Sequence, residues 1–157
     1  MENEVELLAA LAQQENVLQF TTFSSDTALA LGLKVIELAR QKQKSITVQI
    51  SVNGKLLFQH AMQGTTADQA DWIRRKSNVV LRFGRSSYAV GCDYRQRGVA
   101  FDQQKHLPAE EYAAFGGAFP ILLRGSGMIG TAAVSGLRQA EDHALLVEAL
   151  HAVLNER

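Results

Sequence analysis

The chain has 157 residues, of which 46% are hydrophobic and 20% are charged. Its sixteen basic and sixteen acidic residues cancel, and so the net charge creates no field that would attract nucleic acid or an anionic membrane. This composition excludes a disordered chain and is typical of one globular domain over residues 1–157. The single cysteine, Cys92, excludes an internal disulfide and a zinc site built from cysteines.

The N-terminal segment "MENEVELLAALAQQ" is acidic and has a helical pattern. A signal peptide would instead begin with basic residues followed by an apolar stretch. No apolar run in the sequence reaches the roughly 18 residues of a membrane span. These features predict a cytoplasmic protein that makes no contact with a membrane.

The first part of the chain predicts two helices, a strand and a hairpin. Residues 2–13 have a helical pattern, and residues 17–23, "VLQFTTF", are rich in strand formers. The cap residues "SSD" then precede an amphipathic helix over residues 27–42. Two β-rich runs in "SITVQISVNGKLLFQHAM" flank Asn53-Gly54, a pair that favours a type I′ turn, and so they predict a hairpin.

The second part predicts two further helices and another hairpin. Residues 67–83 read as a capped helix that Gly84 is placed to end, and residues 86–110 predict short helical turns and loops. The segment "AFPILLRGSGMIGTAAVSG" predicts a hairpin that turns at residues 124–127, and residues 139–154 predict a final helix. Two hairpins separated by helices favour an α+β fold, with helices packed on a largely antiparallel sheet.

Two of the predicted helices carry an ionisable residue inside an apolar stripe. His143 precedes Leu146 and Val147 by three and four residues, and Lys76 holds an equivalent position four residues before Val80. Burying either side chain without a partner costs several kcal/mol or lowers its pKa. We therefore expect both to lie nearer the interior than is usual for their types, and each to have a partner, reach water or line a pocket.

Each of these residues also has a purely structural interpretation. His143 could bond a nearby backbone carbonyl, and Lys76 could lay its stem on the core and extend its ammonium to water. The lone His60 could bind metal or heme, but it has no supporting pattern around it. No histidine pair has zinc spacing and no carboxylate cluster favours a hard cation, and so no metal site is predicted. The glycines of residues 116–117 match no phosphate loop and predict close backbone approach.

Several segments resemble one known protein family. The series "GGAFPI", "GMIGTAAVSG" and "EDHALL" resembles the heme-degrading or heme-binding protein family, and "MQGT" and "RRKSNVVLRFGRSS" are similar to it further upstream. The resemblance covers about residues 46–154. It is closest to a branch that carries SGLxQxEDH, here Ser135 to His143, in which Leu137 replaces the second glycine of the commoner SGG.

This resemblance implies a profilin-like α+β sandwich, with one antiparallel sheet between helices. It also implies a homo-oligomer, at least a dimer, that binds heme or another small ligand near the sheet and helices. No axial ligand to heme can be transferred residue by residue. Apolar side chains within residues 86–101, "SSYAVGCDYRQRGVAF", would suit an interface between subunits.

We predict a ligand pocket where the "FGRSS" turn meets the "VSG" strand end and the start of the last helix. Free backbone N–H groups at that helix start could hold a carboxylate or phosphate. The residues assigned to the pocket are Lys76, Phe83, Arg85, Ser86, Ser87, Asp142 and His143. Alternatively, Glu141 and Asp142 satisfy the positive end of the helix, and Arg85 pairs with one of them.

Three functions are compatible with the sequence. The chain could bind or handle heme, which requires an apolar pocket wall and a histidine, lysine or tyrosine that reaches the iron. It could be an oligomeric scaffold or interaction module without catalytic activity. It could also be a small-molecule enzyme that uses Lys76 and His143 as acid and base.

Overall fold

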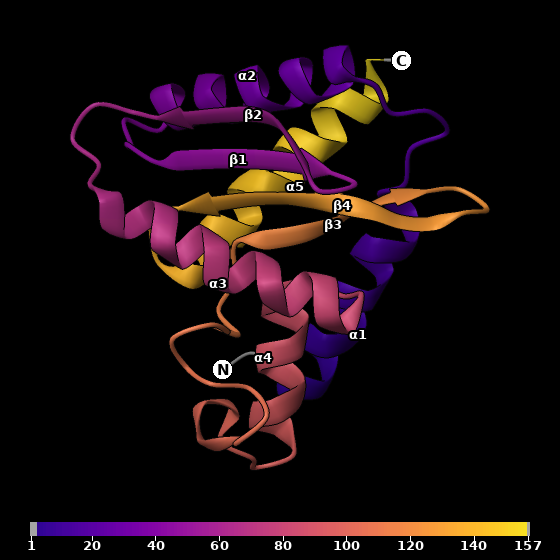
Figure 1. Cartoon of the computed structure of the whole chain (residues 1–157). Coiled ribbons are helices and arrows are strands. Elements are labelled where there is room, and N and C mark those ends of the chain that lie inside the picture. The colour runs from indigo at the N-terminus through magenta and orange to yellow at the C-terminus, as the bar shows by residue number, and fades with distance from the viewer. Residues whose placement is uncertain (1–2, 157) are drawn as a thin grey trace.

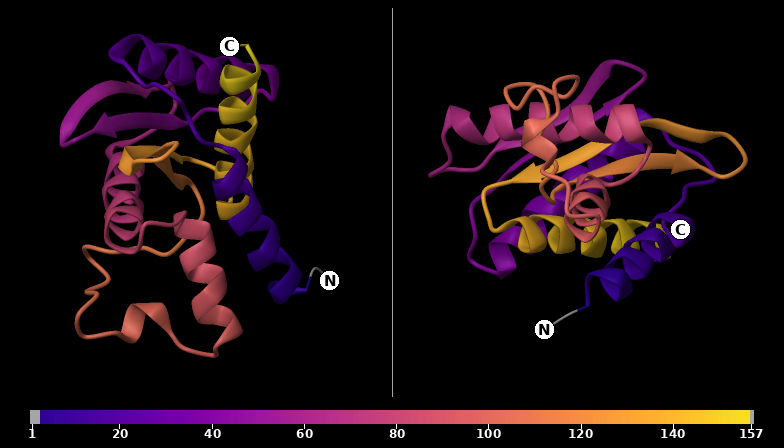
Figure 2. Two further views of the ribbon diagram at one scale, coloured as in Figure 1. Left: turned by 90° about the vertical axis from the view of Figure 1, so that its right-hand side faces the viewer. Right: turned by 90° about the horizontal axis from the view of Figure 1, so that it is seen from below.

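A four-stranded antiparallel sheet lies between two layers of helices (Figure 1; Figure 2). The structure is a computed structural model that describes residues 3–156. Over this range the elements are α1 (Glu4–Val17), α2 (Ser25–Gln41), β1 (Thr47–Val52), β2 (Lys55–Ala61), α3 (Ala67–Phe83), α4 (Ser87–Gln96), the 3-10 helix η1 (Phe101–Gln103), β3 (Ala118–Leu123), β4 (Gly127–Ser135) and α5 (Gln139–Asn155). The predicted α+β fold is confirmed.

The sheet joins the two predicted hairpins along their inner strands. Its order is β2-β1-β4-β3, and every neighbouring pair is antiparallel. Asn53 and Gly54 turn the first hairpin with φ angles of 52° and 79°, the positive values that a type I′ turn needs. Both hairpins are therefore confirmed at their predicted turns.

Alternating side chains of the strands divide the interior between the two faces of the sheet. Helices α2 and α5 cover one face of the sheet and α3 covers the other (Figure 2). Val134 and Ile50 belong to the main core on the first face, whereas Ala133 packs with residues of α3 on the second. On that second face, Ile73 and Val80 of α3 pack on the sheet. The apolar stripe of α3 thus faces the sheet and carries Lys76 into the interior.

The predicted strand over residues 17–23 is wrong. Val17 ends α1, and the segment touches the sheet through a single parallel bridge between Phe20 and Leu123. Leu18 and Phe20 are buried in the core. The apolar side chains of this segment therefore reflect burial of a connection between two helices, which a short sequence window cannot distinguish from strand pairing.

Residues 86–110, for which short helical turns and loops were predicted, contain a regular helix, α4. Ser86 begins it by accepting a hydrogen bond from the backbone N–H of Ala89 at 3.1 Å. Helix α4 lies beside α1 below the sheet (Figure 1), and Leu11 of α1 packs on Ala89 and Cys92. Several of the apolar residues that were expected to suit an interface between subunits are thus covered within the chain, whereas Val99 is exposed.

Capping residues near in sequence define the ends of other helices. Helix α3 has the predicted bounds and ends at Gly84, whose φ of 70° is left-handed. Ser24 and Thr27 form a capping box at the start of α2. Within the range that the structure describes, no helix is long and apolar enough to cross a membrane.

Candidate functional site

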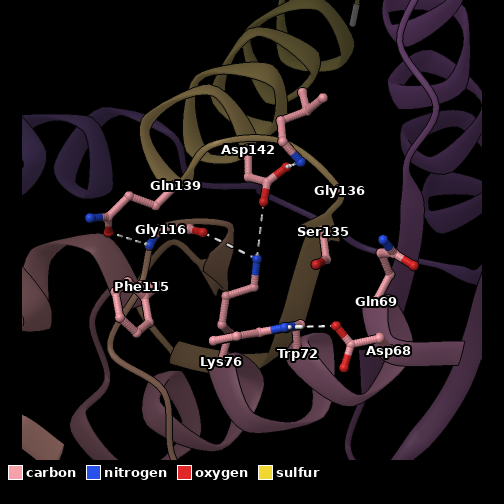
Figure 3. Close-up of a pocket in the computed structure, with 11 residues that line it drawn as sticks. Asp68, Gln69, Trp72, Lys76, Phe115, Gly116, Ser135, Gly136, Gln139 and Asp142 are labelled. Carbon is pink, nitrogen blue, oxygen red and sulfur yellow. Dashed lines mark hydrogen bonds and ion pairs between the residues drawn. The ribbon is translucent and has the colours of Figure 1, made fainter. Parts of the chain in front are cut away.

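The most deeply buried charges of the structure form an ion pair between α3 and α5 (Figure 3). Lys76 and Asp142 are only 2% and 3% exposed, and Lys76 Nζ lies 3.4 Å from Asp142 Oδ2. The same ammonium donates to the backbone carbonyls of Gly116 at 3.1 Å and Val134 at 2.5 Å. All three protons of the ammonium therefore have acceptors.

Two neighbouring glycines let the backbone approach this lysine. Gly117 has a φ of 133°, and a Cβ there would overlap Lys76 Nζ and the carbonyl of Val134. The N–H of Gly116 donates to Gln139 Oε1 at 3.0 Å, which ties the start of β3 to the start of α5. The prediction that this glycine pair serves close backbone approach is confirmed.

Asp142 reaches the pair from the first turn of α5. Its second oxygen, Oδ1, accepts the N–H of Leu137 at 3.0 Å and so holds the strand end against the helix. Burial raises the pKa of Asp142 to about 6, while Lys76 and the backbone N–H groups work against this rise. Burial likewise lowers the pKa of Lys76, and the charge of Asp142 partly offsets that change. The pKa values of the two groups therefore lie closer together than those of an exposed lysine and aspartate.

A cavity of about 300 Å³ opens above the pair. Trp72 and Phe115 form one wall and meet edge to face, with ring centroids 5.7 Å apart. Trp72 donates to Asp68 Oδ2 at 3.2 Å on the rim. The lining residues, ten of which are labelled in Figure 3, are Asp68, Gln69, Trp72, Lys76, Phe115, Gly116, Ser135, Gly136, Leu137, Gln139 and Asp142.

His143 is buried next to Asp142 in the chain but lies outside this cavity. It is 4% exposed, its ring lies near Tyr88 and Phe119, and its Nε2 lies 2.7 Å from Gln14 Oε1 of α1. Burial lowers the pKa of His143 to about 4, and so the ring is neutral at pH 7. The predicted burial of Lys76 and His143 is confirmed, but the two side chains do not face one cavity.

The other residues assigned to the pocket also have places away from the cavity. Ser86 caps α4. Ser87 Oγ accepts a hydrogen bond from the backbone N–H of Ala118 at 3.0 Å, which ties α4 to β3. Phe83 packs in an aromatic cluster beside Tyr94. The charge of Arg85 acts on Glu15 of α1, where it opposes the rise that burial causes in the pKa of that carboxyl. Of the seven assigned residues, the cavity brings together Lys76 and Asp142.

A second, more apolar cavity lies on the other side of Trp72 and Phe115, and sequence reasoning missed it. We call this cavity of about 450 Å³ the aromatic cleft. Its residues come from α3, α4 and the connection that follows, and they are Trp72, Arg75, Gly91, Tyr94, Arg95, Val99, Ala100, Phe101, Asp102, Ala109, Tyr112, Ala113, Ala114 and Phe115. The density of aromatic residues and arginines in residues 86–115 was the available signal, but its spacing has no period.

Aromatic side chains in the cleft also contact cations. Tyr94 meets Phe101 edge to face with centroids 4.9 Å apart, and the guanidinium of Arg75 lies 3.9 Å from the ring centre of Trp72. Tyr112 Oη accepts a hydrogen bond from Arg82 at 3.4 Å.

Among residues 3–156, no group of three or more histidine, cysteine, aspartate or glutamate side chains could hold a metal ion.

Comparison with known proteins identifies the family. The family model described as "Haem degrading protein HbpS-like" matches residues 23–151. A UPF0303 protein from Azotobacter vinelandii is 51% identical over 150 residues, which cover 96% of this chain and 90% of that protein. The chain therefore belongs to the HbpS-like family of haem degrading proteins, as its motifs indicated.

Solved structures agree with the fold. The crystal structure of the Ybr137w protein has a TM-score of 0.86 and 33% identity, and the match covers 95% of this chain and 88% of that one. The crystal structure of a PduOC:heme complex has a TM-score of 0.71 at 20% identity, with 83% and 94% of the two chains covered. The second likeness shows the shared fold alone.

Proposed function

We propose that this protein binds heme, or a ligand with the same flat apolar body and acidic groups, in the aromatic cleft. The observation that carries this proposal is the combination of aromatic walls, two tyrosines and two arginines around one cavity of about 450 Å³. The family description names haem, and the related PduOC protein was crystallised in a heme complex, which supports the same ligand class.

The cleft residues fit the three requirements of heme. Trp72, Phe101 and Phe115 offer apolar surface to a macrocycle. Arg75 and Arg95 could pair with the propionates, because guanidinium groups bind carboxylates in a bidentate manner. Each arginine now contacts an exposed carboxylate, Asp71 or Glu4, which a propionate would join or replace.

Tyrosine supplies the axial ligand in this proposal. Tyr94 and Tyr112 line the cleft, and tyrosine is an established ligand of heme iron. Lys76, by contrast, already donates all three of its protons inside another cavity, and His143 lies outside both cavities. Bound heme would supply redox chemistry, while the chain orients the group and limits its contact with water.

Titration with hemin tests the proposal. The wild-type chain is expected to shift the Soret band of hemin. Tyr94→Phe or Tyr112→Phe is expected to weaken hemin binding at least about tenfold, which is roughly 1.4 kcal/mol of binding free energy, because the variant lacks the ligand to the iron. Tyr88→Phe is the matched control, because Tyr88 contacts His143 and lies outside the cleft. Absence of any Soret shift would exclude heme, and loss of binding in His60→Ala or His143→Ala would move the site elsewhere.

We also propose that the protein is a cytoplasmic homo-oligomer. The support is the family resemblance together with the outer strand β2, whose free edge presents unpaired backbone groups, and the exposed Leu29 and Leu33 of α2 beside it. Light scattering at micromolar concentration is expected to give at least twice the 17.2 kDa of one chain. A mass equal to one chain would contradict this expectation.

A further inference from the structure

We propose that Lys76 is a nucleophile that forms an imine with small aldehydes or ketones that enter the cavity beside Trp72 and Phe115. This site is the cavity of Figure 3 and not the aromatic cleft. A test of imine formation is therefore independent of whether heme binds. The ligand class follows from the placement of the amine, from its hydrogen bonds and from the walls of the cavity.

Lys76 is one of the residues that border a cavity of ligand size. Lys76 lines the cavity of about 300 Å³, and Figure 3 shows its Nζ in the middle of the lining residues. A lysine attacks a carbonyl group only as the neutral amine. Burial favours that form, because it lowers the pKa of Lys76 relative to an exposed lysine.

The hydrogen bonds around Nζ define which proton can leave. Two N–H groups point to the carbonyls of Gly116 and Val134 at 3.1 and 2.5 Å, and a backbone carbonyl is not a base at neutral pH. The third points to Asp142 Oδ2 at the longer distance of 3.4 Å. Asp142 is therefore the group that takes the proton, and the lone pair that remains points toward Asp142 Oδ2.

The same two residues can complete the reaction without another reagent. Proton transfer gives a neutral Lys76 amine and a neutral Asp142 carboxyl. The amine nitrogen bonds to the carbonyl carbon while its C=O electrons move to oxygen, and a proton from nitrogen gives the carbinolamine. Asp142 then donates its proton to the hydroxyl group, water leaves, and the protonated imine pairs with the Asp142 carboxylate.

The walls limit the size and character of the carbonyl compound. Trp72 and Phe115 offer apolar surface, while Ser135 and Gln139 lie on the lining as polar groups. A volume of about 300 Å³ lies at the small end of ligand pockets. A short aldehyde or ketone with an apolar substituent fits this space, whereas a large planar ligand belongs in the aromatic cleft.

Reductive trapping on the whole chain tests the inference. Propionaldehyde and sodium cyanoborohydride are added at pH 7, and the propylated lysines are identified by peptide mass mapping over time. Lys76 is expected to react at least about tenfold faster than any other lysine, because burial favours its neutral amine and the cavity holds the aldehyde beside it. The internal comparison is with Lys34, Lys42, Lys44, Lys55 and Lys105.

Two further arms make the result decisive. In urea the preference for Lys76 is expected to disappear, since it depends on the folded cavity, and Lys76→Met is expected to lose the fast phase. If Lys76→Met folds poorly, the peptide mass map of the wild-type chain still shows whether Lys76 reacts faster than the other lysines. Labelling of Lys76 at the rate of the exposed lysines, or its complete absence, would show that the lysine is only a structural partner of Asp142.

Discussion

Replacing Lys76 with methionine is expected to lower the free energy of unfolding by about 3 kcal/mol, the low end of the roughly 3 to 5 kcal/mol that removal of one partner from a buried ion pair costs. The substitution leaves the Asp142 carboxylate 3% exposed without its ammonium, and it takes a donor from the carbonyls of Gly116 and Val134. Protonation of Asp142, whose pKa is already about 6, limits the loss. Urea denaturation at pH 7.5 measures it.

A second substitution shows whether the pair itself causes the effect. In Lys76→Met/Asp142→Asn no charge is left unpaired, and the oxygen of the new amide can still accept the N–H of Leu137 that Asp142 holds at 3.0 Å. The double variant is expected to be at least about 1 kcal/mol more stable than the sum of the single variants predicts. Lys34→Met is the matched control, because Lys34 pairs with Glu37 and Glu156 at the surface and its loss should change stability little. Strict additivity would contradict the role assigned to the pair.

The elements that the sequence predicted well are those whose signals are local. Asn53-Gly54 determines a turn by its own backbone preferences, and Gly84 ends α3 for the same reason. Helical spacing also placed Lys76 in the interior, because a side chain in the apolar stripe of a helix turns with that stripe toward the sheet.

Proximity across the chain could not be predicted in the same way. Helical spacing indicated that Lys76 and His143 are both buried, but the direction in which each side chain points depends on tertiary packing. Asp142 and His143 are adjacent on α5 and therefore point about 100° apart, one toward α3 and the other toward Gln14 of α1. Only Asp142 reaches the cavity of Lys76.

The aromatic cleft was missed for a related reason. Its walls combine α3, α4 and the connection up to Phe115, and no single segment carries the pattern. Trp72 lies four residues before Lys76 and so shares the apolar stripe of that helix in the sequence. In the structure it is half-buried between the two cavities, with Phe115 on one side and Arg75 over its ring. A residue that separates two cavities looks like a core residue in sequence.

His143 is expected to make the protein less stable as the pH falls. Its pKa is about 4 in the folded chain, because the ring is buried, and its ordinary value is 6.5. Above pH 6.5 the ring is neutral in both states. Between pH 6.5 and 4 the unfolded chain binds a proton that the folded chain does not, and so this residue favours unfolding by about 2 kcal/mol at pH 4.5 relative to pH 7.5.

A variant comparison is needed because two carboxyl groups act in the opposite direction. Burial raises the pKa of Glu15 to about 7 and that of Asp142 to about 6, and so the folded chain binds these protons first and gains stability as the pH falls. His143→Gln removes only the titrating ring, and its stability relative to wild type is expected to improve by about 2 kcal/mol between pH 7.5 and 4.5. His60→Gln, which changes an exposed histidine of β2, is the control. If the curves of wild type and His143→Gln run parallel, protonation of His143 does not oppose folding, and its ring is not held neutral by burial.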